Sequence, residues 1–185
     1  MAKNVLTDEQ LVAAVRSSNS ELYSEIIKRY QEKLSHYLKK FIRDNDELED
    51  VLQSVFIKAY KNLNSFNIHK KFSSWIYRIA HNEAINYLKK NYKYGLSLDE
   101  WEYDVIDEKL DFSKDLDREL TRERINQALA SIKPKYQEPL VLFFFEQKTY
   151  EEISEILHLP INTVGTLIAR GKQNLKKFLD QEKYG

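Results

Sequence analysis

The sequence contains no cysteine, which excludes a disulfide framework, a cysteine-ligated zinc or iron–sulfur site and a cysteine nucleophile. Glycine and proline are also scarce, with four and three in 185 residues, and neither occurs in residues 1–94. Strand-and-turn architectures rely on these two residues at their turns. Their absence from half of the chain therefore indicates helices joined by short polar turns, and we expect an all-α fold.

Long hydrophobic segments are missing as well. The longest uninterrupted apolar run covers residues 140–145, far short of the ~20 residues that a membrane-spanning helix needs. The first ten residues lack the apolar core of a signal peptide. We therefore expect a cytoplasmic protein without membrane insertion.

Catalytic and cofactor motifs are not recognisable in the chain. The four glycines are too scattered for a phosphate-binding loop. Acidic pairs such as Glu151 and Glu152 fall at exposed or capping positions, where nothing shifts their pKa values toward acid–base catalysis. The histidines do not have the spacing of metal ligands; they are His36, His69, His81 and His158. We expect no enzyme activity, no cofactor and no bound metal.

Charge is balanced overall but segregated along the chain. Lysine plus arginine and aspartate plus glutamate both number 29, so the formal net charge is zero. Residues 1–94 carry sixteen basic and eleven acidic side chains, residues 95–121 carry three and ten, and residues 122–185 carry ten and eight. Such a density of negative charge disfavours compaction. We predict two domains, 1–94 and 122–185, joined by an acidic linker at 95–121 that turns helical from about residue 113.

The first domain begins with amphipathic segments. Thr7 and Gln10 have the spacing of a capping box, and residues 20–42 carry apolar side chains at helical intervals. Residues 48–63 form the most regular helical pattern, in which Tyr60 belongs to the core stripe. The opposite face carries Asp50, Gln53, Ser54 and Ile57. This face is either solvated with one stray isoleucine or a docking face for another helix.

A further helix is predicted over residues 74–90, after a polar connector. One side of this helix is free of carboxylates and carries Arg78, Asn82, Ile85 and Lys89. The preceding connector adds Phe66, His69, Lys70, Lys71 and Phe72. Cations that hold phosphates, interleaved with rings on which bases can stack, suit an unpaired nucleic-acid strand. The alternative is that Phe72, Trp75 and Tyr77 are core residues and that the lysines only increase solubility.

The C-terminal region has the pattern of a helix-turn-helix. Thr149 and Glu152 form a capping box that opens a helix over 150–157; Pro160 follows, and a second helix runs from Asn162 to about Leu179. We expect Gly171 to allow close approach of a neighbouring helix. The outward face is free of acid and carries Thr163, Thr166, Arg170, Asn174 and Lys177. These donors and cations suit a DNA major groove, although a plain helical hairpin is the alternative.

Three motifs in this order carry a family resemblance. They are Asp50-Val-Leu-Gln53-x-Val-Phe56, then Phe66-(x)5-Phe72-x-x-Trp75-Ile-Tyr77-Arg78-Ile-Ala-x-Asn82, and finally Thr149-Tyr-Glu-Glu152-Ile with Pro160-x-x-Thr163-Val. Together they resemble the extracytoplasmic-function group of bacterial sigma factors, within the sigma-70 family. The resemblance covers nearly the whole chain.

The resemblance implies a specificity subunit that directs core RNA polymerase to promoters and melts the −10 region without ATP. The polymerase-binding residues would be Asp50, Gln53, Ser54 and Ile57, which would meet a coiled coil of the largest core subunit. At the −10 element, Asn82 and Asn86 would bind base edges, and Trp75 and Tyr77 would support the loop or stack. Phosphates would be held by Lys70, Lys71, Arg78 and Lys89.

The same resemblance implies that the acidic linker threads through the polymerase and that the helix-turn-helix reads the −35 element. Gly165 and Leu167 stand where family members often have basic residues, so we expect weaker −35 recognition with a smaller salt dependence. An anti-sigma factor is an expected further partner. The competing hypotheses are a stand-alone helix-turn-helix regulator, which would have no use for the connector and helix at residues 66–90, and a helical nuclease, which would need a metal-binding carboxylate cluster.

Overall fold

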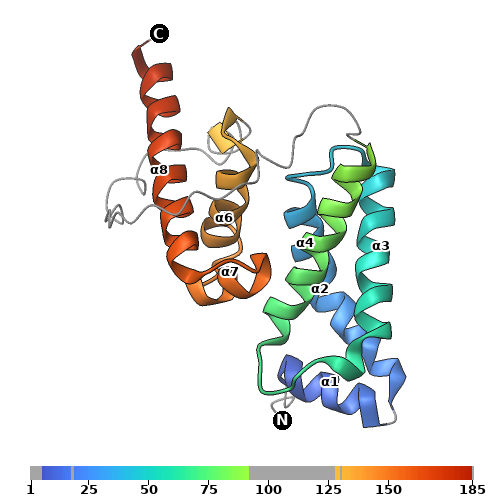
Figure 1. Ribbon diagram of the computed structural model, residues 1–185. Helices are drawn as coiled ribbons and strands as arrows, with labels where there is room; N and C mark the ends of the chain where they lie inside the picture. The colour runs from blue at the N-terminus through green and yellow to red at the C-terminus, as the bar shows by residue number, and fades with distance from the viewer. Residues whose placement is uncertain (1–5, 18, 92–127, 130, 185) are drawn as a thin grey trace, which may run out of the picture. The chain divides into compact units, whose positions relative to one another are not determined.

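The computed structural model of the chain (Figure 1) describes residues 6–17, 19–91, 128–129 and 131–184. Every regular element in these ranges is a helix, as expected. The helices form two compact units, one built from residues 8–91 and the other mostly from residues 134–184. The predicted acidic linker at 95–121, and its helical onset near residue 113, lie outside the described residues.

The N-terminal unit consists of four α-helices and two short 3-10 helices. They are α1 (Asp8–Ser17), η1 (Ser20–Leu22), α2 (Tyr23–Leu38), α3 (Asn45–Lys61), η2 (Leu63–Ser65) and α4 (Phe72–Asn91). The predicted capping box is confirmed, because Thr7 N–H donates to Gln10 Oε1 at 2.9 Å and Gln10 N–H donates to Thr7 Oγ1 at 3.2 Å. Asp44 caps α3 by accepting from the N–H groups of Asp46 and Glu47.

The core of this unit lies where α4 packs against α2 and α3. Its fully buried side chains include Leu11, Ile26, Leu34, Tyr37, Val55, Ile76 and Tyr77. The prediction that Tyr60 belongs to the core was wrong, because this residue is 47% exposed. Its ring packs edge-on against Tyr23, with the centroids 4.9 Å apart, so it lies at the rim of the core rather than inside it.

A polar network fastens α1 to α2. Arg29 Nη1 lies 2.8 Å from Asp8 Oδ1, and the Tyr30 hydroxyl donates to Asp8 Oδ2 at 2.5 Å. Burial, and then the hydrogen bond to this carboxylate, raise the pKa of Tyr30. The network orients α1 on the unit and satisfies the polar groups that the contact desolvates.

The C-terminal unit contains α6 (Pro134–Phe144), α7 (Tyr150–Leu157) and α8 (Ile161–Tyr184). The capping box between Thr149 and Glu152 is present, and α7 has the predicted bounds. His158 ends α7 in the left-handed conformation, with φ of 56°. Helix α8 starts one residue earlier than predicted and continues past Leu179.

Close contact between α6 and α8 depends on Gly171. A Cβ atom at this position would lie 2.7 Å from Leu140 Cδ1 and 3.3 Å from the carbonyl oxygen of Tyr136. The predicted close approach is therefore confirmed. On the same helix, Lys172 is buried with its ammonium 4.9 Å from the centroid of the Phe143 ring, where a cation–π contact compensates part of its desolvation.

Neither a membrane-spanning helix nor a metal-binding cluster occurs in the described residues. No helix there has the length and hydropathy that crossing a membrane requires. No group of three or more histidine, aspartate or glutamate side chains in the described ranges could hold a metal ion.

Candidate docking and nucleic-acid interfaces

The outer face of α3 carries the residues predicted to dock a partner helix. Asp50 and Gln53 are exposed, Ser54 is half-buried, and Ile57 is 47% exposed. An apolar side chain therefore does stand in solvent within a polar row. Burying it against a partner would be favourable, at about 25 cal/mol per Å² of apolar area removed from water.

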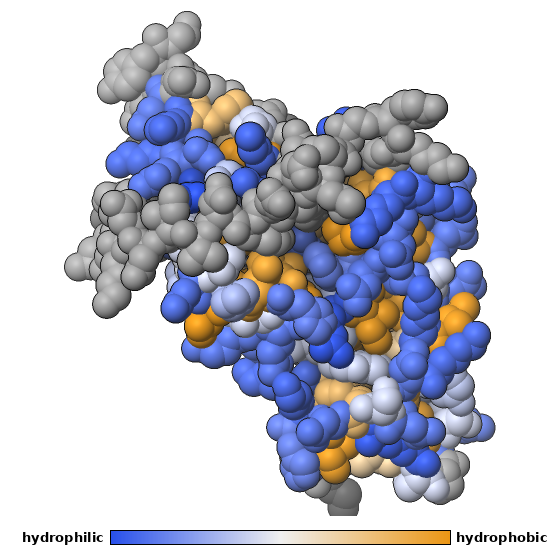
Figure 2. Space-filling model, in the orientation of Figure 1, coloured by the Kyte–Doolittle hydropathy of each residue, from blue (hydrophilic) through white to orange (hydrophobic). Residues whose placement is uncertain are grey.

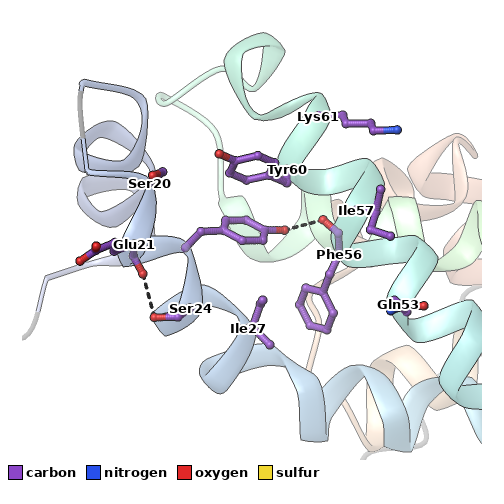
Figure 3. A pocket seen from close by; sticks show the side chains of 10 residues that line it. Ser20, Glu21, Ser24, Ile27, Gln53, Phe56, Ile57, Tyr60 and Lys61 are labelled. Atoms are coloured by element: carbon purple, nitrogen blue, oxygen red, sulfur yellow. Dashed lines mark hydrogen bonds between the residues drawn. The ribbon is translucent and has the colours of Figure 1, made fainter.

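A groove that the sequence did not predict lies beside this face. It has a volume of ≈ 680 Å³, and its apolar lining comes from Ile27, Phe56, Ile57 and Tyr60. Figure 3 shows Gln53, Ile57 and Tyr60 along α3, with Ser24 and Ile27 on the opposite side. The groove was not predicted because Tyr60, which lines it, was assigned to the core.

Tyr23 holds the floor of this groove in place. Its hydroxyl donates to the carbonyl oxygen of Phe56 at 2.7 Å, and its ring is buried between η1 and α3. Burial raises the pKa of Tyr23, because the phenolate would lose its hydration there.

The outer face of α4 is free of negative charge, as the sequence predicted. Asn82, Asn86 and Lys89 are exposed and Arg78 is half-buried. The only carboxylate of α4, Glu83, pairs with α3, where Lys58 Nζ lies 2.5 Å from Glu83 Oε1, and it also accepts from Asn86 Nδ2 at 3.4 Å. The row from Arg78 to Lys89 is about 16 Å long at 1.5 Å per residue. On the face of the N-terminal unit seen in Figure 2, hydrophobic patches lie between hydrophilic side chains.

The connector between η2 and α4 exposes its polar and basic side chains. His69, Lys70 and Lys71 are all exposed. At the tip, Asn67 Oδ1 accepts from His69 N–H at 3.0 Å, and the Asn67 carbonyl accepts from Lys70 N–H at 2.9 Å. The sequence analysis did not single out Ile68, which is 44% exposed. It could have been recognised as an apolar residue between the polar residues Asn67 and His69.

Three rings that were predicted to contact nucleic acid lie in the core instead. Phe66, Phe72 and Tyr77 are 4%, 0% and 1% exposed, so their faces are not available for stacking with a base. Phe66 and Phe72 pack with Trp75, with centroids 5.3 to 5.5 Å apart. Trp75 is half-buried and is the ring of this cluster that reaches solvent. The alternative interpretation, in which the aromatics form the core, describes Phe72 and Tyr77, because burying rings of this size stabilises the unit strongly.

The predicted DNA-facing row on α8 is present except at its first residue. Lys177 is exposed, and Thr166, Arg170 and Asn174 are half-buried. Thr163 is 3% exposed and lies one turn before Leu167, which is also 3% exposed. Thr163 therefore belongs to the buried face and cannot contact a base. Leu167 is likewise a core residue here, which explains physically why this chain has no cation at that position.

Comparison with known proteins identifies the family. Residues 26–94 match the model of Sigma-70 region 2, and residues 122–175 match that of Sigma-70, region 4. In structure, the chain resembles CnrH in its complex with the cytosolic domain of CnrY, with a TM-score of 0.70 and 20% identity over 94% of this chain and 97% of the other. It also resembles the sigma factor RpoE of Bartonella quintana, in complex with the anti-sigma factor NepR, with a TM-score of 0.65 and 19% identity over 85% and 96% of the two chains.

Sequence identity is higher to a bacterial relative than to these two structures. The ECF RNA polymerase sigma factor SigW of Bacillus subtilis (strain 168) is 32% identical over 177 residues, which cover 91% of this chain and 94% of the relative. A stand-alone regulator is not favoured, because the match extends through the region 2 segment as well as the helix-turn-helix. The chain therefore belongs to the extracytoplasmic-function group of the sigma-70 family and is an RNA polymerase sigma factor.

Proposed function

We propose that the N-terminal domain, residues 1–94, docks on core polymerase and opens the −10 region, and that residues 122–185 read the −35 element. The acidic segment 95–121 links the two. The observation that carries this proposal is the outer face of α4, where Arg78, Asn82 and Lys89 form a row without a carboxylate on a helix that follows a basic connector. Such a face suits a polyanion better than a protein partner.

At the −10 element, Asn82 and Asn86 bind base edges, because an amide offers both a donor and an acceptor. Lys70, Lys71, Arg78 and Lys89 hold phosphates, and the half-buried Trp75 offers the ring of its cluster that reaches solvent. Unpairing and extruding a base costs a few kcal/mol, and stacking at ~1–3 kcal/mol per base offsets it. The buried rings Phe66, Phe72 and Tyr77 support the connector. This protein itself catalyses no reaction and needs no cofactor.

The α3 face and the adjacent groove form the polymerase-docking surface. Asp50, Gln53, Ser54 and Ile57 meet a coiled coil of the largest core subunit, with Ile57 supplying the apolar contact. An anti-sigma factor is a further partner, which is supported by the fold shared with RpoE, solved in complex with one. The protein acts where the polymerase is, in the cytoplasm.

The −35 contacts come from α8. Thr166, Arg170, Asn174 and Lys177 reach the groove and its phosphates, whereas Thr163 packs inside the unit. Gly165 and the buried Leu167 leave two positions without a cation. Each missing phosphate contact reduces the salt dependence of binding. Recognition of the −35 element is accordingly weak, and the isolated protein binds duplex promoter DNA poorly.

The deciding experiment combines co-purification with bacterial core polymerase and run-off transcription from genomic promoters. Asp50→Arg abolishes the association, whereas Glu32→Arg, the same change in charge at an exposed site of α2, leaves it intact. Asn82→Ala reduces open-complex formation without loss of polymerase binding, and Asn19→Ala serves as its control. Normal association by the Asp50 variant, or loss of assembly by the Asn82 variant, would contradict the assigned roles.

A further inference from the structure

Helix α1 precedes the residues that match region 2, yet it contacts both ends of the connector that leads into α4. We propose that Arg16 and Glu9 of α1 are positioning residues that hold η2 and the connector after it, residues 63–71, in the conformation that reads the −10 element. This inference rests on the function proposed above for the connector and α4. It extends the promoter-reading apparatus to a helix that touches no DNA itself.

Arg16 holds the beginning of the connector. Its Nε donates to the carbonyl oxygen of Leu63 at 2.8 Å, and its Nη2 donates to the carbonyl oxygens of Leu63 and Phe66. Leu63 is the first residue of η2, and its carbonyl also accepts from the N–H of Phe66 at 3.2 Å, while Phe66 is the C-cap of η2. The guanidinium also lies 5.9 Å from the centroid of the Phe66 ring. One planar guanidinium with several donors therefore binds two backbone carbonyls, those of Leu63 and Phe66.

Glu9 holds the end of the connector. Its Oε1 accepts from the backbone N–H of Phe72 at 3.0 Å, in a partly buried position. Phe72 is the first residue of α4, so this N–H has no partner within the helix. A carboxylate at a helix N-terminus is favourable both as an acceptor and through the helix dipole. Glu9 thus sets the point at which the connector becomes α4.

The segment between these two points is exposed and contains a local turn. Asn67, Ile68, His69, Lys70 and Lys71 are exposed, and Asn67 accepts from the N–H groups of His69 and Lys70. Figure 1 shows the connector passing along α1 on its way to α4. The position of the tip therefore depends on its two ends. Fixing them in advance removes part of the ordering cost that capture of a DNA strand would otherwise carry.

Helix α1 is itself suited to act as a fixed support. Asp8 is bound to Arg29 and Tyr30 of α2, and Leu11 and Val12 are buried in the core. Arg16 and Glu9 lie on one helix, seven residues apart, which is close to two turns. They can therefore contact the two ends of the connector from one rigid element.

The test measures how well the assembled holoenzyme discriminates between promoters. Arg16→Ala and Glu9→Ala remove the contacts, while Arg16→Lys and Glu9→Gln keep a donor and an acceptor. Arg43→Ala and Glu32→Gln remove the same charges at exposed sites away from the connector. Run-off transcription compares the native −10 element with one that carries a single base change, and core binding and thermal unfolding are measured in parallel.

For one mismatched base pair the wild-type ratio of transcription from the two promoters is on the order of tenfold or more, and we expect it to fall to within about threefold in both alanine variants. The connector is then no longer held in the conformation that reads the base. Core binding stays unchanged. Glu9→Gln keeps most of the ratio because its amide oxygen still accepts, whereas Arg16→Lys loses part of it because an ammonium cannot reproduce the contacts with two carbonyls. The proposal is overturned if folded alanine variants keep the wild-type ratio while Asn82→Ala loses it, since the contacts then only stabilise the fold. If Asn82→Ala also keeps the ratio, the function proposed for α4 is at fault instead.

If Arg16→Ala fails to fold, Arg16→Lys decides the matter. A lysine ammonium cannot reproduce the fork that reaches two carbonyls. A folded Arg16→Lys variant with reduced discrimination supports the proposal, and one with full discrimination and a lower melting temperature overturns it.

Discussion

Two glycines in α8 allow a matched test of the contact between α6 and α8. Both have a helical backbone, but the atoms around them differ. Gly165 and Gly171 both lie inside the helix. A Cβ atom at Gly165 would meet Tyr150 Cε2 at 3.6 Å, an ordinary contact, whereas one at Gly171 would lie 2.7 Å from Leu140 Cδ1 and 2.9 Å from Leu140 Cγ. Alanine at the first position should therefore fit, and alanine at the second should not.

The magnitudes follow from two opposing effects. Alanine favours a helix over glycine by about 1 kcal/mol, because glycine loses more backbone entropy on folding. Gly165→Ala should accordingly raise the free energy of unfolding by up to about 1 kcal/mol. At Gly171 the same gain is opposed by overpacking of about 1–3 kcal/mol, since Leu140 is fully buried and the Tyr136 carbonyl belongs to the backbone. We expect Gly171→Ala to be destabilised by about 1 kcal/mol, a gap of about 2 kcal/mol between the variants.

Thermal and urea unfolding of the full chain, followed by circular dichroism at 222 nm, measure this gap. Tryptophan fluorescence would not report on α8, because Trp75 and Trp101 both lie outside it. For a unit of this size, 1 kcal/mol corresponds to a shift in melting temperature of about 4–8 °C. Equal stabilisation of both variants would refute the close α6–α8 contact, and destabilisation by Gly165→Ala would refute the ordinary helical geometry at that position.

Three further predictions concern pH, capping and salt. Burial raises the pKa values of Tyr23 and Tyr30 above the ordinary value of 10.0, so above pH 10 the folded state keeps protons that the unfolded state releases. These two groups should not affect stability below pH 10, and stability should decrease as pH rises above it. In a Tyr23→Phe/Tyr30→Phe variant the urea midpoint should decrease less steeply with pH. Thr149→Ala should lower the free energy of unfolding by about 0.5–2 kcal/mol through loss of the capping box, as measured by urea unfolding; an unchanged midpoint would show that the cap does not stabilise α7. Lys177→Ala should reduce the salt slope of holoenzyme binding to the promoter by about one, whereas an unchanged slope would show that Lys177 contacts no phosphate.

Local patterns predicted most of the α-helices but not all of their ends. Helix α6 (Pro134–Phe144) was not predicted, and α4 begins at Phe72 rather than at residue 74. The capping boxes at Thr7 and Thr149 join residues three apart, and the apolar intervals of α3 and α8 repeat within one or two turns. Such signals are local, so they survive without knowledge of the partner surface. The acid-free side of α4 was visible for the same reason, because it depends only on which residues share a helical face. The family was also recognisable, since its motifs are short and their order is linear.

Which of the predicted contact residues face solvent depends on packing between segments that are far apart in the sequence. Phe66, Phe72, Tyr77 and Thr163 were assigned to nucleic acid, but all four are buried. Their burial was not predicted, because a connector without periodicity and the first turns of a helix do not show which side faces the core. The grip of α1 on the connector was equally invisible. Arg16 and Leu63 are 47 residues apart, and Glu9 and Phe72 are 63 apart. Such pairs meet only after the core of α1, α2 and α4 has brought them together, so no pattern of neighbouring residues encodes them.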